Sequence, residues 1–120
     1  MKLLAPRRRP GSSPSKKLLA ATTLLLAACT PMTADEMTRG PPWRSYASAH
    51  SREDVAQCIA RALPHTNVLP GRAETVVNQW NFDGPLAFTW VITDAGTGSS
   101  IRAWRANALM GGSSHAEACF

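Results

Sequence analysis

A chain of 120 residues has room for one folded domain at most. Its formal net charge is +5, but six positive charges precede the first acid, whereas seven arginines and eight acids follow residue 29. The basic balance therefore belongs to the N-terminal segment. The remainder has no basic run of the kind that nucleic-acid binding requires, and we expect no nucleic-acid partner.

The first 28 residues have the three parts of a secretory signal peptide. Basic residues extend to Lys17, an apolar stretch covers residues 18–28, and small residues end it. That stretch is too short to span a bilayer, which takes about 20 apolar residues. We expect residues 1–28 to be removed on export.

The residues around the cleavage point, Leu26, Ala27, Ala28 and Cys29, resemble the lipobox of bacterial lipoproteins. The resemblance implies that the Cys29 thiol receives a diacylglyceryl group, that a peptidase cuts before Cys29, and that the new amine is acylated. Two or three acyl chains give stable membrane attachment, whereas one gives marginal binding. The alternative is an ordinary signal peptide that happens to end in Ala-Ala-Cys. Because Thr30 follows instead of Asp, enteric-type sorting favours the outer membrane, facing the periplasm.

Residues 29–50 are expected to form the lipidated N-terminus and a flexible tether. They contain Pro31, Pro41 and Pro42 among small polar residues and show no apolar periodicity. Trp43 has little reason to be buried there. It is expected either to lie at the membrane interface, where Trp is enriched, or to have no particular role. The folded domain is expected to cover residues 51–120.

A helix is the clearest secondary-structure prediction. Ser51 is a good N-cap and Asp54 lies three residues later, as in a variant capping box. Pro64 ends the segment. The apolar positions follow helical spacing on one stripe: Val55, Cys58, Ile59, Ala62 and Leu63.

After the helix the apolar period changes to two, which predicts strands at 75–82, 86–94 and 100–106 and a short one around 67–69. Asp83-Gly84 and residues 94–98 are typical of hairpin turns. Residues 115–119 are expected to add one helical turn. The predicted fold is α+β: one N-terminal helix packed on a three- or four-stranded antiparallel sheet.

Alternation along 86–94 predicts an inner face of Leu86, Phe88, Trp90 and Ile92. The helix has one apolar stripe and can cover one sheet face, so we expect solvent to cover the other, formed by Ala87, Thr89, Val91 and Thr93. The aromatic residues Trp80, Phe82, Phe88, Trp90 and Trp104 are expected in the core. The alternative is that Trp80 or Trp104 is exposed and contacts a sugar or a protein.

If Ile101 and Ala103 face the helix, then Arg102 and Trp104 face outward and form a partner-contact patch. Arg and Trp are the residue types that anchor protein interfaces most often. The alternative is an inward Trp104 beside a solvated Arg102.

Lipidation of Cys29 leaves Cys58 and Cys119 as an even pair in an exported chain, which predicts a structural disulfide. Free or intermolecular thiols are the alternatives. A redox site is disfavoured because the chain has no Cys-x-x-Cys pair.

No catalytic, cofactor or metal site is expected. His50, His65 and His115 share no metal-ligand spacing, and the Gly-Ser segments are typical of turns rather than of a nucleophile elbow. In layout, residues 51–120 resemble small bacterial envelope lipoproteins, which implies no particular activity. We expect a non-enzymatic binding or accessory role toward an envelope protein. The alternative is an inhibitor or ligand-binding module directed at a cell-wall enzyme or glycan.

Overall fold

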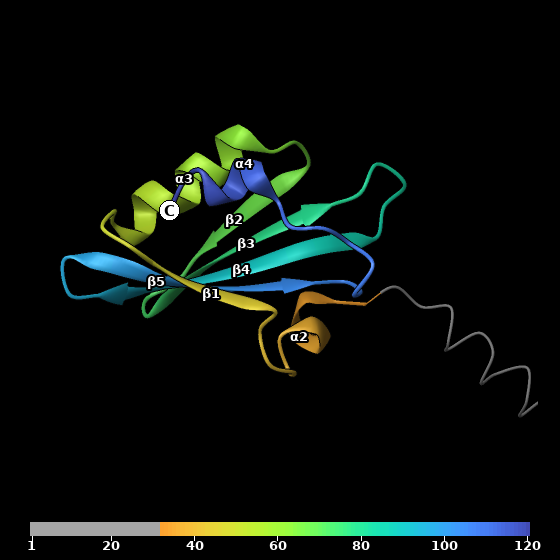
Figure 1. The fold of residues 1–120 in the computed structure, drawn as a ribbon, viewed down its shortest axis with the longest axis horizontal. Coiled ribbons are helices and arrows are strands. Elements are labelled where there is room, and N and C mark those ends of the chain that lie inside the picture. The colour runs from red at the N-terminus through yellow and green to blue at the C-terminus, as the bar shows by residue number, and fades with distance from the viewer. Residues whose placement is uncertain (1–31) are drawn as a thin grey trace, which may run out of the picture. The chain divides into compact units, whose positions relative to one another are not determined.

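The computed structural model describes residues 32–120. One antiparallel sheet of five strands, in the order β1-β5-β4-β3-β2, forms its centre. Helices α3 and α4 lie over one face of this sheet, and the short helix α2 lies on the opposite face (Figure 1). The elements in chain order are α2 (Ala34–Met37), β1 (Arg44–Ser48), α3 (Arg52–Ala62), β2 (Thr66–Pro70), β3 (Glu74–Trp80), β4 (Leu86–Ala95), β5 (Gly98–Arg105) and α4 (Ser114–Glu117).

The expected architecture is wrong in its detail, although the class is α+β. The sheet has five strands rather than three or four, and the helix expected at the N-terminus follows α2 and β1. The additional strand comes from the segment interpreted as a tether. It pairs antiparallel with β5, with Arg44 opposite Ala103 and Ser48 opposite Ser99.

The tether prediction for residues 29–50 is therefore wrong from Thr33 onward. Thr33 caps α2 in a complete capping box: its side chain accepts from the Glu36 amide, and the Glu36 side chain accepts from the Thr33 amide. Beyond α2, the Trp43 amide donates to the Ala103 carbonyl at 2.8 Å and leads the chain into β1. This segment is part of the folded unit.

The prediction of a helix after Ser51 is confirmed. The Ser51 hydroxyl accepts from the Asp54 amide at 3.1 Å, and the helix ends at Ala62, before Leu63 and Pro64. Its apolar side faces the sheet and forms the larger hydrophobic core. The buried members of that core from α3 and the three central strands are Val55, Ala56, Ile59, Val77, Ala87, Phe88, Trp90, Ile92, Ile101 and Ala103.

A β-bulge in β4 overturns part of the predicted alternation. Gln79 pairs with Phe88, but the next residue, Trp80, pairs with Leu86, so Ala87 is an extra residue on β4. Ala87 consequently joins the core beneath α3, whereas Leu86 packs on the opposite face. The sequence pattern assigns these two residues the other way round, because strict alternation assumes a strand without a bulge.

The face opposite α3 is not left to solvent. Met37 of α2 packs there with Leu86, Val91 and Trp104, and all four are buried. Thr89 is fully buried on the same face and donates a hydrogen bond to the Asn78 side chain at 2.7 Å. The sheet is therefore covered around its centre on both sides.

Candidate functional site

The four lipobox residues, Leu26, Ala27, Ala28 and Cys29, lie outside the described residues. The described fold becomes regular at Thr33, the cap of α2, which follows Cys29 by four positions in the sequence. A lipid on Cys29 would therefore be tied closely to the folded unit and not through a spacer of about twenty residues.

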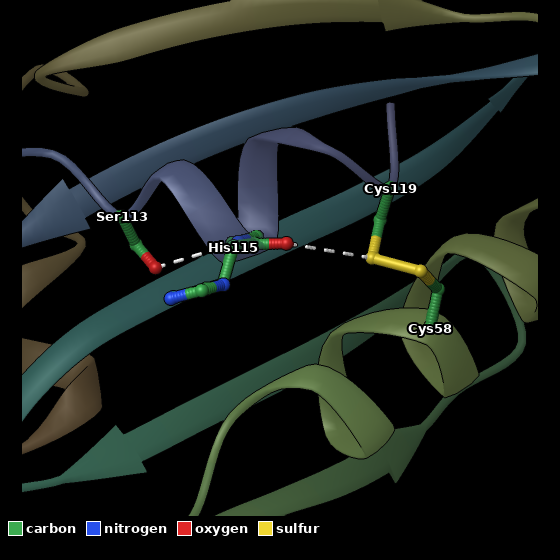
Figure 2. The surroundings of a disulfide bond; sticks show 5 residues. Cys58, Ser113, His115 and Cys119 are labelled. Carbon is green, nitrogen blue, oxygen red and sulfur yellow. Dashed lines mark hydrogen bonds between the residues drawn. A yellow bond between two sulfur atoms is a disulfide. The ribbon is translucent and has the colours of Figure 1, made fainter.

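A disulfide joins Cys58 of α3 to Cys119, two positions beyond the end of α4 (Figure 2). The two residues are 61 positions apart, and their Cα atoms are 5.7 Å apart. The sequence-based pairing is present in the structure. The bond holds the C-terminal segment against α3, on the side of the sheet that carries the larger core.

Helix α4 positions Cys119, the second cysteine of the disulfide. The Ser113 hydroxyl accepts from the Ala116 amide at 3.4 Å, and Ala116 is completely buried. The Cys119 Sγ lies 3.9 Å from the His115 carbonyl oxygen (Figure 2). An oxidised sulfur has no proton to donate, so this is a packing contact. The arrangement is a structural staple.

A depression of about 220 Å³ lies beside the staple. Its charged and titratable lining comprises His50, Asp54 and Arg61, and the disulfide forms another part of the wall. A second depression, of about 200 Å³, contains Arg52, whose guanidinium donates to the Gly71 carbonyl at 2.8 Å and lies 3.4 Å from the Asp94 carboxylate. Arg52 thus links the start of α3 to the β2–β3 turn and to the end of β4.

A polar cluster joins β1 to α4. The Tyr46 hydroxyl donates to the Glu117 carboxylate at 3.1 Å, and Arg44 lies 3.7 Å from the same carboxylate. Burial, with a further contribution from Glu117, raises the pKa of the Tyr46 phenol above 10.0 despite the opposing effect of Arg44. This cluster ties the edge strand to the C-terminal segment.

The expected patch of Arg102 and Trp104 needs correction. Both residues lie on the face opposite α3, but Trp104 is only 5% exposed. Its indole N–H donates to the Gly40 carbonyl at 2.9 Å, and α2 covers the ring. Arg102 is exposed, lies above the ring and pairs with Glu74 at 3.6 Å. Trp104 is therefore part of a second core and cannot present an exposed partner contact.

Sequence reasoning missed the segment that buries Trp104, although Thr33-Ala-Asp-Glu36 has the spacing of a capping box and could have revealed it. It also placed Phe82 in the core, whereas Phe82 is 90% exposed in the β3–β4 hairpin. No signal singled out Leu109, which is 97% exposed in the β5–α4 connection.

Comparison with protein-family models, curated proteins and solved structures finds no match to this chain. Within residues 32–120, no three His, Cys, Asp or Glu side chains are grouped closely enough to hold a metal ion. Among the helices of the same residues, none is long and apolar enough to cross a membrane.

Proposed function

We propose that this chain is the precursor of a bacterial envelope lipoprotein, anchored through a lipid on Cys29. The observation that carries the proposal is the Leu26-Ala27-Ala28-Cys29 motif at the end of an apolar stretch that follows a basic segment. After cleavage before Cys29, the folded unit would stand at the membrane surface, at the outer membrane facing the periplasm.

The Cys58–Cys119 disulfide supports export of the folded unit. Disulfides persist in oxidising compartments such as the periplasm and are rare in the bacterial cytosol. The expected export signal and a bond that persists in oxidising compartments are thus consistent with each other.

Replacement of Cys29 tests the anchor. Wild-type protein should incorporate labelled fatty acid and fractionate with membranes, and Cys29→Ser should lose both properties. The matched control is a Cys58→Ser/Cys119→Ser double variant, which also loses cysteines but should keep the label. A Cys29→Ser protein that still matures to the same mass and stays with membranes would refute the proposal.

The folded unit is proposed to act by binding an envelope protein in a non-enzymatic role. Both sheet faces are covered around their centres, so a partner can reach the loops, the outer side of α3 and the two edge strands, β1 and β2. Edge strands carry backbone groups that can pair with another chain. Exposed side chains on these edges include Ala47 and Asn67.

Photo-crosslinking in intact cells tests the binding role. A photoreactive amino acid at position 47 or 67 should give a discrete adduct with an envelope protein from at least one edge. The same amino acid at the exposed position 57, on the outer side of α3 and away from both edges, is the control and should give no discrete adduct. The absence of protein adducts from both edges would contradict a partner at the sheet edges.

A further inference from the structure

Several connections gather at one end of the sheet. The strand register places the end of β3, the start of β4 and the end of β5 together there, because Trp80 pairs with Leu86 and Phe88 pairs with Arg105. The β3–β4 hairpin and the β5–α4 connection therefore lie at the same end. The described chain also begins at this end, on the right in Figure 1.

This end carries the most exposed large apolar side chains among residues 32–120. Phe82 in the β3–β4 hairpin is 90% exposed and Leu109 in the β5–α4 connection is 97% exposed. Met32, at the start of the described chain, is 45% exposed. The remaining exposed large apolar residue, Leu69 at 51%, lies toward the opposite end of β2, where Pro70 pairs with Thr75.

Hydrogen bonds fix the backbone of both tips. In the hairpin, the Asn81 amide donates to the Pro85 carbonyl at 2.8 Å and the Gly84 amide donates to the Asn81 carbonyl at 3.0 Å. Phe82 lies between them, its ring 4.7 Å from that of His65. The hairpin is thus held with the Phe82 side chain outward.

The Leu109 tip is held in a similar way. The Leu109 amide donates to the Asn107 side chain at 3.0 Å, and the neighbouring Met110 packs against the larger core while its carbonyl accepts from Arg105. The connection therefore turns Met110 inward and Leu109 outward.

We propose that this end of the molecule, with Phe82 and Leu109 at its tips, inserts shallowly into the lipid bilayer that carries the anchor. The proposal rests on the proposed lipidation of Cys29. Four residues of fully extended chain span at most about 14 Å, so the anchor would hold Thr33 within that distance of the membrane surface. A bilayer is the apolar phase that an anchored domain meets first, which favours it over a second copy or a protein partner.

The surroundings of the tips suit a membrane interface. Trp43 is partly buried at the same end, with the guanidinium groups of Arg44 and Arg105 over its ring at 4.6 and 4.3 Å. Tryptophan is enriched at membrane interfaces, and arginine interacts with lipid phosphates. Asp83 adjoins Phe82, and Glu117 pairs with Arg44. These acids restrict insertion to the side-chain tips.

Tryptophan quenching in vesicles tests the orientation. Lipidated mature protein, which begins at Cys29, is reconstituted into phosphatidylethanolamine–phosphatidylglycerol vesicles with ordinary or brominated acyl chains. The variants are Phe82→Trp, Leu109→Trp and the control Leu69→Trp. The emission added by each substitution is obtained by subtracting the wild-type signal. We expect brominated chains to reduce the added emission at least twofold for positions 82 and 109 and to leave that of position 69 unchanged.

The outcomes separate the orientation from the anchor. If the proteins float with the vesicles but positions 82 and 109 are quenched no more than position 69, the orientation is wrong and the anchor stands. If the lipid is absent and the proteins do not float with the vesicles, both the anchor and the orientation are refuted. All three sites are exposed, and circular dichroism checks that each variant is folded.

Discussion

Asn78 and Thr89 are buried polar residues on the sheet face covered by α2, and a hydrogen bond joins their side chains. The Thr89 hydroxyl donates to the Asn78 side-chain oxygen at 2.7 Å across β3 and β4. A buried acceptor that loses its donor costs about 1–3 kcal/mol, whereas replacing both partners by apolar groups of similar shape is nearly neutral.

We therefore expect Thr89→Val to lower the free energy of unfolding by about 1–3 kcal/mol, because Asn78 loses its donor. The double variant Asn78→Leu/Thr89→Val should recover most of that loss. Urea denaturation of the two variants and the wild type measures the difference. A double variant that is less stable than Thr89→Val alone would show that the pair does not act as described.

Tyr46 is the only tyrosine in the chain, so its ionisation can be followed by ultraviolet absorbance without interference. Burial raises the pKa of its phenol, and Glu117 adds to this effect. We expect an ionisation midpoint above 10.0, the ordinary value, and a lower midpoint in Glu117→Gln. A midpoint at or below the ordinary value in the wild type would contradict the packing of Tyr46 against α4.

The same shift has a definite effect on stability. Between the unfolded and folded pKa values of Tyr46 the native chain binds more protons than the unfolded chain, so stability falls as pH rises through this window. Below the unfolded pKa the phenol is protonated in both states and contributes no pH dependence.

At the scale of elements, the sequence predicts helix α3 and the three central strands well, because each has a strong apolar period and a recognisable cap or turn. It fails for α2 and β1. Helix α2 is a single turn, and β1 is a five-residue edge strand of mostly small or polar residues. Neither element has an apolar period, and although Thr33 and Glu36 have the spacing of a capping box, the burial of both elements depends on contacts with distant residues.

The failures at the candidate site have the same origin. The parity of Arg102 and Trp104 is evident from the strand pattern, but the burial of Trp104 depends on Met37 and Gly40, more than sixty positions earlier. Pairing of Cys58 with Cys119 could be inferred by counting, because only two cysteines remain after Cys29. Counting does not depend on knowing the fold.

The cover provided by α2 leads to a matched pair of variants. Met37→Ala should destabilise the protein by about 2–5 kcal/mol, since Met37 is buried against Leu86 and Trp104. Met32→Ala removes the same side chain at an exposed position and should change stability by less than about 0.5 kcal/mol. Denaturation and iodide quenching of tryptophan emission measure both variants.

Only Met37→Ala should increase quenching, because it opens a path to Trp104. A Met37→Ala protein as stable and as shielded as Met32→Ala would show that residues 32–43 behave as a tether after all.

At the scale of the whole molecule, the folded unit is small, and small domains bury a limited core. The Cys58–Cys119 bond closes a loop of about 60 residues, for which the chain-entropy model predicts a stabilisation of about 4 kcal/mol. We expect Cys58→Ser/Cys119→Ser to lose stability of this order in thermal or urea unfolding. A loss below about 1 kcal/mol would mean that α4 and the C-terminal residues hold their place without the staple.

The anchor and the fold together describe a domain held close to a membrane, and the intact mass of the protein from washed envelope membranes tests this account most directly. The account predicts a chain that begins at Cys29, carries a diacylglyceryl group and an amide-linked acyl chain, and is two hydrogens lighter for the disulfide. A mass equal to the whole 120-residue chain, or to a shortened chain without lipid, would contradict it.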